Sequence, residues 1–187
     1  MNTAILKYLL FIPALAMVGC AVTTQSSPHV PENDLATLAK YRQWTLVNSE
    51  LQLMAPLSAM SCAIIRGRNE SSPHTNKYVS VFVNPVGREQ MMTKQRPKFP
   101  VGTMIVKEKH GSLDSTKPEV LTAMIKRQPG YNPESGDWEY LLLDGAATTI
   151  VEQGKLTRCS GCHHLYQSSD FITRTYLPET VRRELKP

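Results

Sequence analysis

The chain has 187 residues, of which 41% are hydrophobic, 20% charged and 7% aromatic, and its formal net charge is +5. This composition is that of a globular protein long enough for a full hydrophobic core, and it excludes disordered and collagen-like chains. The 21 Lys and Arg residues are scattered along the chain, so the charge predicts no nucleic-acid partner. Four cysteines are too few for a disulfide scaffold, so each must be explained by its neighbours.

The first segment is typical of an export signal. Lys7 precedes an apolar run at residues 8–18, which is shorter than the roughly 20 residues that a membrane-spanning helix needs. Residues 17–20, Met-Val-Gly-Cys, are similar to the lipobox of bacterial lipoproteins, which predicts cleavage before Cys20 and acylation of that cysteine. By the same resemblance, Ala21 favours anchoring on the periplasmic side of the outer membrane. The alternative is an ordinary signal cut at another small residue.

Three regions follow from this pattern. Residues 1–19 are expected to be a lipoprotein-type signal peptide. Residues 20–34 are mostly polar with two prolines, which is typical of a tether. Residues 35–187 are expected to form one domain.

Hydrophobic periodicity predicts the elements of this domain. Residues 35–44 fit a short helix with Asp34 as its cap, and a helix-like segment is expected from Asn84-Pro85 to residue 94. Asp144-Gly145 reads as a hairpin turn. Alternating apolar residues predict strands at 77–83, 104–109, 120–127, 138–143 and 148–152. The fold class is therefore mainly β (α+β), a single-domain antiparallel sheet with a few short helices.

The motif that carries chemistry is Cys159-Ser160-Gly161-Cys162-His163. This is the spacing of a c-type haem attachment site, in which the two thiols form thioethers with the haem vinyl groups and His163 binds the iron. A signal peptide is an independent argument, because c-type haem is attached outside the cytoplasm. Few residues follow His163 and none of them is Met, so the opposite face of the haem is expected to come from residues before Cys159.

The two cysteines have three other interpretations. A redox pair is expected at the start of a helix in a βαβ unit, and no such unit precedes Cys159. A zinc site needs another close pair of soft ligands, and only Cys62 and isolated histidines are present. A structural disulfide is the third interpretation.

Several blocks of sequence resemble the cytochrome P460 family, which includes the β-type cytochromes c′. The blocks are residues 41–44, 78–84, 99–108 and 132–138, followed by the haem motif. The resemblance implies one covalent haem c on an antiparallel sheet, mostly in the periplasm. It also implies activity toward small nitrogen compounds, since some members oxidise hydroxylamine with a haem cross-linked to lysine and others bind nitric oxide. Homodimers occur in the family.

The resemblance places Lys107 where the hydroxylamine-oxidising members have the cross-linking lysine. A lysine held against a haem edge loses hydration, which favours the neutral, nucleophilic amine. The alternatives are a solvated strand lysine like Lys109, or a partner for Glu108 or a haem propionate. A period of two puts Lys107 on one face with Ile105, which permits burial.

The enzyme interpretation lacks one group. Hydroxylamine-oxidising members place a carboxylate over the haem as a base, and the matching position here is near Thr122 on a strand without Asp or Glu. Glu119 and Glu134 are acidic alternatives. Whether the chain is an enzyme therefore stays open at this point.

The remaining histidines and Cys62 have several interpretations. His74 is a candidate sixth iron ligand, which would favour electron transfer with a redox partner protein, or else a surface histidine. His164 is expected outside the iron shell, and His110 exposed. Cys62 is expected to be a buried free thiol, and the alternative is a role in the haem pocket or in an intermolecular contact. Lys126 and Arg127 are expected on a solvated face rather than at haem propionates.

Taken together, the sequence predicts a lipid-anchored periplasmic haem protein that binds or oxidises a small nitrogen-oxide ligand. The alternatives are a one-electron carrier with a six-coordinate haem, and a lipoprotein that keeps the fold without haem.

Overall fold

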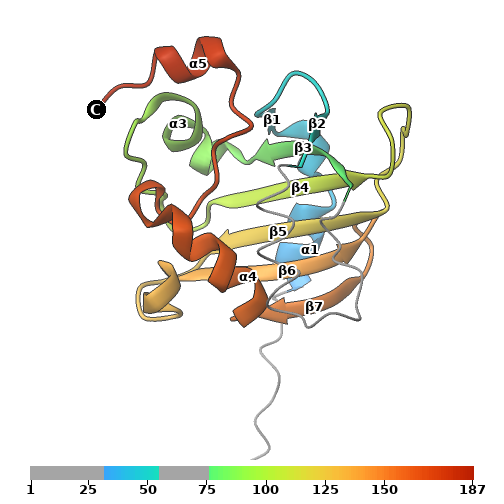
Figure 1. Cartoon of the computed structure of the whole chain (residues 1–187). Helices are drawn as coiled ribbons and strands as arrows, with labels where there is room; N and C mark the ends of the chain where they lie inside the picture. The colour runs from blue at the N-terminus through green and yellow to red at the C-terminus, as the bar shows by residue number, and fades with distance from the viewer. Residues whose placement is uncertain (1–31, 55–75) are drawn as a thin grey trace, which may run out of the picture.

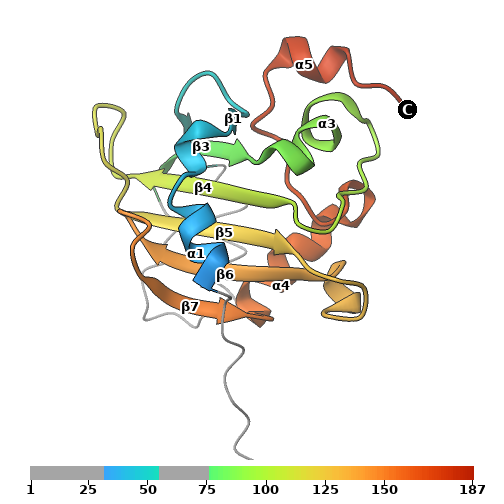
Figure 2. The same cartoon turned by 180° about the vertical axis from the view of Figure 1, so that it is seen from behind.

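The computed structural model describes residues 32–54 and 76–187. Within these residues, seven strands form one antiparallel sheet in the order β1-β3-β4-β5-β6-β7, and β2 also pairs with β3. The short helices and the C-terminal segment lie on its two faces (Figures 1 and 2). The predicted antiparallel, mainly β fold is therefore confirmed.

Five predicted strands are present in the sheet. The strands are β1 (Thr45–Leu46), β2 (Gln52–Leu53), β3 (Tyr78–Val83), β4 (Met104–His110), β5 (Val120–Lys126), β6 (Trp138–Asp144) and β7 (Ile150–Gly154). The α-helices are α1 (Glu32–Leu38), α3 (Pro85–Thr93), α4 (Thr157–His163) and α5 (Glu179–Arg183). The 3-10 helices are the single turns η1 (Tyr41–Gln43) and η2 (Pro133–Ser135) and the longer η3 (His164–Ser169), which is kinked at Tyr166. The short strands β1 and β2, the helix α4 and the helix α5 were not predicted.

The N-terminal helix differs from its prediction. α1 begins at Glu32 and ends at Leu38, and a separate 3-10 turn follows where the helix was expected to run to residue 44. Asp34 is therefore inside α1 and is not its cap. Its carboxylate lies 2.7 Å from Nη1 of Arg127, so it pairs with a cation that follows the end of β5. A contact distant in sequence thus decides the role of this side chain.

The segment after β3 follows its prediction. Asn84 is the N-cap of α3, and its side-chain oxygen accepts a hydrogen bond from the backbone N–H of Gly87 at 3.2 Å. Pro85 occupies the first helical turn, where its missing N–H costs nothing. The helix expected from residue 85 is confirmed.

Each face of the sheet has its own core, because side chains alternate along the strands. We call the face under α4 and the C-terminal segment the pocket face, and the opposite one the α1 face (Figures 1 and 2). Buried residues of the pocket face include Val81, Ile105, Met124, Tyr140, Ile172, Tyr176 and Leu177. Those of the α1 face include Leu38, Tyr41, Val106, Leu121 and Leu141. All side chains of β4, the strand between β3 and β5, are buried except that of Lys107, which is half-buried.

Among the helices in residues 32–54 and 76–187, none has the length and apolar content that crossing a membrane would need.

Candidate haem-binding site

Helix α4 carries the two cysteines and the histidine of the Cys-x-x-Cys-His motif. Cys162 is three residues and His163 four residues after Cys159, and these spacings place side chains as neighbours on a helix. Leu156, directly before the helix, and Cys159 pack against the core of the pocket face. Packing on the sheet therefore orients the motif. Gly161 and two cysteines are weak helix formers, which explains why local sequence did not predict α4.

His163 is held in a single orientation and protonation state. Its Nδ1 lies 2.6 Å from the carbonyl oxygen of Phe171, which can only accept, so Nδ1 carries the proton and donates. Its ring centroid lies 5.4 Å from that of Tyr140. Burial lowers the pKa of His163 to about 4, and the positive charges of Lys107 and Lys109 act in the same direction. At neutral pH His163 is therefore uncharged, with the lone pair of Nε2 available, which is the form that binds a metal.

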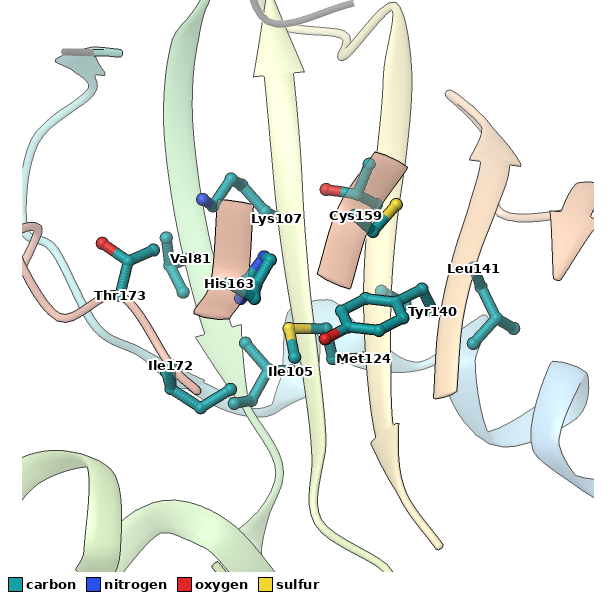
Figure 3. Close-up of a pocket in the computed structure, with 12 residues that line it drawn as sticks. Val81, Ile105, Lys107, Met124, Tyr140, Leu141, Cys159, His163, Ile172 and Thr173 are labelled. Carbon is teal, nitrogen blue, oxygen red and sulfur yellow. The ribbon is translucent and has the colours of Figure 1, made fainter. Parts of the chain in front are cut away.

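A pocket adjoins this helix on the sheet (Figure 3). Most of its lining is apolar, and none of the lining residues that the structure describes is Asp or Glu. The lining consists of Val81, Ile105, Lys107, Thr122, Ala123, Met124, Tyr140, Leu141, Cys159, His163, Ile172 and Thr173. The pocket thus combines a thiol, an imidazole and one amine with an otherwise largely apolar wall.

Lys107 and Thr122 lie side by side in this pocket. Strand register pairs Lys107 with Val81 on β3 and with Thr122 on β5, so all three lie in one row on the pocket face. The Nζ atom of Lys107 is 4.6 Å from the centroid of the Tyr176 ring, a cation–π distance. The expectation that Lys107 shares a face with Ile105 is confirmed, since both line the pocket.

The acidic alternatives lie elsewhere. Glu119 forms an ion pair with Lys77, and Glu134 is an exposed residue of η2. Neither lines the pocket. The position that the resemblance gave to a carboxylate is thus occupied by the hydroxyl of Thr122.

Two expectations about β4 are wrong. Lys109 was expected to be solvated, but it is 0% exposed and lies on the pocket side of the sheet. His110 was expected to be exposed, and it is 4% exposed on the α1 face, where its Nε2 contacts Glu108. Both are buried because β4 lies between β3 and β5 and is covered on both faces. The alternation that placed Lys107 also applies to Lys109, so the sequence did contain this signal.

The basic residues at the end of β5 are also not on a solvated face. Lys126 pairs with both carboxylate oxygens of Asp170 at 2.8 Å. Arg127 pairs with Glu139 at 2.7 Å and with Asp34. These carboxylates are distant in sequence, so composition alone did not reveal them.

Of the other residues singled out from the sequence, the structure describes His164 but not His74, Cys62 or Cys20. His164 is exposed, and its ring packs edge-on against Phe171 with centroids 5.7 Å apart. His74, Cys62 and Cys20 lie outside the described residues. In the part of the chain that is described, no group of three or more His, Cys, Asp and Glu side chains is arranged to hold a metal ion.

The residues present fit a c-type haem. Two thiols and a neutral imidazole stand on one helix beside a pocket with mostly apolar walls, which is the donor set and the surroundings that such a haem requires. Fold and site together define a class of haem protein built on an antiparallel sheet rather than on a helical bundle.

The chain belongs to the cytochrome P460 family, whose model matches residues 38–174. The matched range includes β3 to β7, Lys107 and the complete Cys-x-x-Cys-His motif. No curated protein was found to match the chain. Membership supports a c-type haem as the cofactor and nitrogen compounds as the class of ligand.

Proposed function

We propose that this protein carries one haem c, attached through Cys159 and Cys162 with His163 on the iron, and binds a small nitrogen oxide such as nitric oxide. One observation carries the proposal. The neutral His163 adjoins a pocket whose described lining is largely apolar and holds no carboxylate. Such a pocket suits an uncharged ligand, which loses little hydration on entering.

The protein residues have distinct tasks in this proposal. The haem, when bound, supplies an iron at which a small ligand binds and one electron is exchanged. His163 keeps its proton on Nδ1, which leaves Nε2 for the iron, and the carbonyl of Phe171 fixes the plane of the ring. Ile105, Met124 and Ile172 exclude water from the pocket.

A spectroscopic titration tests this function. The haem-loaded protein is reduced and titrated with nitric oxide, beside a His163→Gly variant and a control, His164→Ala, at the exposed neighbour. We expect wild type and control to have a five-coordinate ferrous iron that binds nitric oxide, and His163→Gly to have an altered resting spectrum. A six-coordinate iron that ignores nitric oxide would contradict the proposal and favour an electron carrier, with His74 as the first candidate ligand to mutate.

Covalent attachment has its own test. We expect the colour to stay with the protein after extraction with acidified acetone, and to become extractable in a variant that lacks both Cys159 and Cys162. Haem that is extracted from the wild type would overturn attachment through the two thiols.

A second candidate function is hydroxylamine oxidation, and the position of Lys107 inside the pocket favours it. A bond from Nζ of Lys107 to a haem ring carbon removes one hydrogen from each atom together with two electrons, so its formation needs an oxidant such as a peroxide. We expect a cross-linked protein to show a ferrous Soret band far to the red that returns to the ordinary haem c position in Lys107→Ala. The control is Lys186→Ala, at an exposed lysine. Ordinary spectra in all three proteins would exclude the cross-link.

The site of action is also part of the proposal. Export and acylation at Cys20 would hold the protein at the periplasmic side of the outer membrane, where it exchanges electrons with a redox partner protein. Fractionation of cells that express Cys20→Ser tests the anchor. We expect the variant to move to the soluble periplasmic fraction, and continued membrane binding would contradict acylation.

A further inference from the structure

We infer that the buried ion pair Lys126–Asp170 positions the iron-binding histidine, acting through the carbonyl group of Phe171. This inference rests on the proposed role of His163 as the axial ligand. Asp170 and Lys126 are positioning residues in this account, because neither lines the pocket.

The turn that carries the Phe171 carbonyl has an unfavourable backbone. Asp170 and Phe171 have φ values of 53° and 64°, so two successive non-glycine residues are left-handed. Asp tolerates this region, whereas a bulky side chain such as Phe adopts it only where its surroundings hold it there. The same turn presents its carbonyl oxygen to Nδ1 of His163 at 2.6 Å. Whatever holds the turn therefore also holds the hydrogen bond to the histidine.

Asp170 is the point at which the sheet holds this turn. Its side chain, in a residue that is 5% exposed, accepts hydrogen bonds from Lys126 to both oxygens and from the backbone N–H of Phe99, all at 2.8 Å. Its backbone carbonyl accepts a hydrogen bond from Nε1 of Trp138 at 2.8 Å. The Nζ atom of Lys126 also lies 5.0 Å from the centroid of the Trp138 ring. Contacts from β5, from β6 and from the segment before β4 thus converge on one residue.

Gly136 makes room for the next residue of the turn. A Cβ atom at this position would lie 2.6 Å from the ring of Phe171, so no other residue fits without displacing that ring. The backbone N–H of Phe171 donates to the carbonyl of Tyr166 at 2.8 Å, which closes the turn from the other side. The position of the Phe171 carbonyl is therefore determined by several independent contacts.

The hydrogen bond at Nδ1 controls how strongly an axial imidazole donates to iron. For a haem held by His163, a short bond to a carbonyl would raise the basicity of Nε2, stabilise the ferric state and strengthen the bond from His163 to the iron. A turn that has lost the Lys126–Asp170 pair would let this hydrogen bond lengthen. The reduction potential would then rise, and nitric oxide would more readily displace His163 from the ferrous iron.

Two single variants separate positioning from a plain charge effect. Lys126→Met leaves a buried negative charge, which lowers the potential through space, while Asp170→Asn leaves a positive charge, which raises it. Loss of positioning raises the potential in both. We expect both haem-loaded variants to have a higher reduction potential than wild type. At a fixed ambient potential the ratio of ferrous to ferric protein should rise about tenfold, which corresponds to a shift of ~59 mV for one electron. Both should also form more five-coordinate ferrous nitrosyl complex than wild type.

Two further variants complete the test. Lys126→Arg keeps a cation that can pair with Asp170, and we expect it to restore most of the wild-type potential. Arg127→Met removes the neighbouring cation, which pairs with Asp34 and Glu139 rather than with Asp170, so it shows the through-space effect of losing a cation: it should lower stability and should not raise the potential. The inference is overturned if the reduction potential moves in opposite directions in Lys126→Met and Asp170→Asn. It is also overturned if the potentials of these two variants equal that of Arg127→Met.

The same experiments distinguish a failure of this inference from a failure of the proposed function. If His163 is not the axial ligand, His163→Gly keeps the wild-type spectrum, and the proposed function fails first. If His163→Gly changes the spectrum while both variants of the ion pair keep the wild-type potential and nitrosyl complex, only the positioning role is wrong.

Discussion

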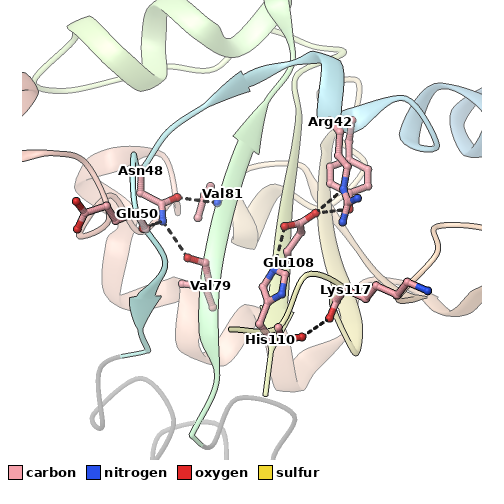
Figure 4. Close-up of polar contacts among 10 residues, drawn as sticks. Arg42, Asn48, Glu50, Val79, Val81, Glu108, His110 and Lys117 are labelled. Atoms are coloured by element: carbon pink, nitrogen blue, oxygen red, sulfur yellow. Dashed lines mark hydrogen bonds and ion pairs between the residues drawn. The ribbon is translucent and has the colours of Figure 1, made fainter. Parts of the chain in front are cut away.

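Glu108 provides the sharpest test of how the sheet is stabilised, and the perturbation is Glu108→Gln. The carboxylate lies buried on the α1 face and accepts hydrogen bonds from three side chains (Figure 4). These come from the hydroxyl of Tyr41 at 2.5 Å, Nε of Arg42 at 2.8 Å and Nε2 of His110 at 3.0 Å. Burial and the neighbouring Glu108 raise the pKa of Tyr41 above its usual 10, so its hydroxyl stays a donor.

The expected cost follows from these contacts. A bond to a charged acceptor contributes about 1.5–3 kcal/mol and a neutral one about 0.5–1.5 kcal/mol, so each of the buried bonds from Tyr41 and His110 weakens by about 1 kcal/mol. The amide NH₂ of Gln also turns one donor–acceptor contact into a contact between donors. Arg42 adds less than about 1 kcal/mol because its side chain is 56% exposed. We expect a total loss of about 3 kcal/mol, which corresponds to a fall in Tm of roughly 6–12 °C for a domain of this size.

The effect has a defined dependence on pH. Burial alone would raise the pKa of Glu108, but the hydrogen bonds from Tyr41, His110 and Arg42 outweigh it and leave the pKa below the ordinary value of 4.5. A carboxyl group whose pKa is lowered on folding stabilises the protein above its unfolded-state pKa, and this contribution is lost as the pH falls through the folded-state pKa. The gap between wild type and variant is therefore full at pH 7 and shrinks below about pH 4.5.

Urea unfolding followed by circular dichroism at pH 7 and at lower pH measures this gap. The control is Glu179→Gln. Like Glu108, Glu179 forms ion pairs, here with Arg182 at 2.7 Å and Arg183 at 3.0 Å, but these lie at the surface. The control should lose clearly less stability than Glu108→Gln, because solvent screens its exposed ion pairs. Equal losses in the two variants at pH 7, or a gap for Glu108→Gln that stays constant to pH 3, would refute this reasoning.

Two further substitutions test the packing of the sheet. The amide of Asn48 is buried and bonds the backbone of β3 at 2.8 Å and 2.9 Å, and Asn48→Ala removes both bonds. Two backbone groups lose this partner, so urea unfolding should show a loss of about 2–4 kcal/mol in the free energy of unfolding. A loss below about 1 kcal/mol would contradict this role. Gly136 and Gly130 both have a positive φ, which an alanine would strain. A Cβ atom at Gly136 would also clash with the ring of Phe171, whereas a Cβ atom at Gly130 would meet open space. Thermal unfolding should therefore show a larger fall in Tm for Gly136→Ala than for Gly130→Ala. Equal falls would show that the Phe171 ring moves away at no cost.

The sequence predicted the elements whose signal is local. Residues 78–83 and 120–126 alternate between the two sides of the sheet, and this pattern alone defines a strand. The Cys-x-x-Cys-His spacing likewise stands within five adjacent residues. The strands β1 and β2 have two residues each. Asn48 lies in the segment that joins them, and its side chain bonds the backbone of β3, so the pairing of both strands with β3 depends on this side chain. No local pattern could have predicted them.

The support of the candidate site depends on contacts between distant residues. Asp170 is 44 residues from Lys126 and 71 from Phe99, and only the fold brings them together. The sequence therefore identified the histidine of the motif but not the residues that hold its orientation. Signals of this kind are absent from spacing and composition, because the partners belong to separate segments of the chain: Lys126 ends β5, Phe99 precedes β4 and Asp170 follows η3.

Strand β4 has pocket residues on one face of the sheet and a buried polar cluster on the other. Ile105, Lys107 and Lys109 face the pocket side, whereas Glu108 and His110 face α1. Lys107 and Glu108 are thus neighbours in sequence with the sheet between their side chains. Because Glu108 is bonded to η1 and to its own strand, it fixes β4 from the side away from the pocket. The placement of Lys107 then depends on contacts that lie on the other side of the sheet from the pocket, and a change at Glu108 reaches the pocket only by moving the strand itself.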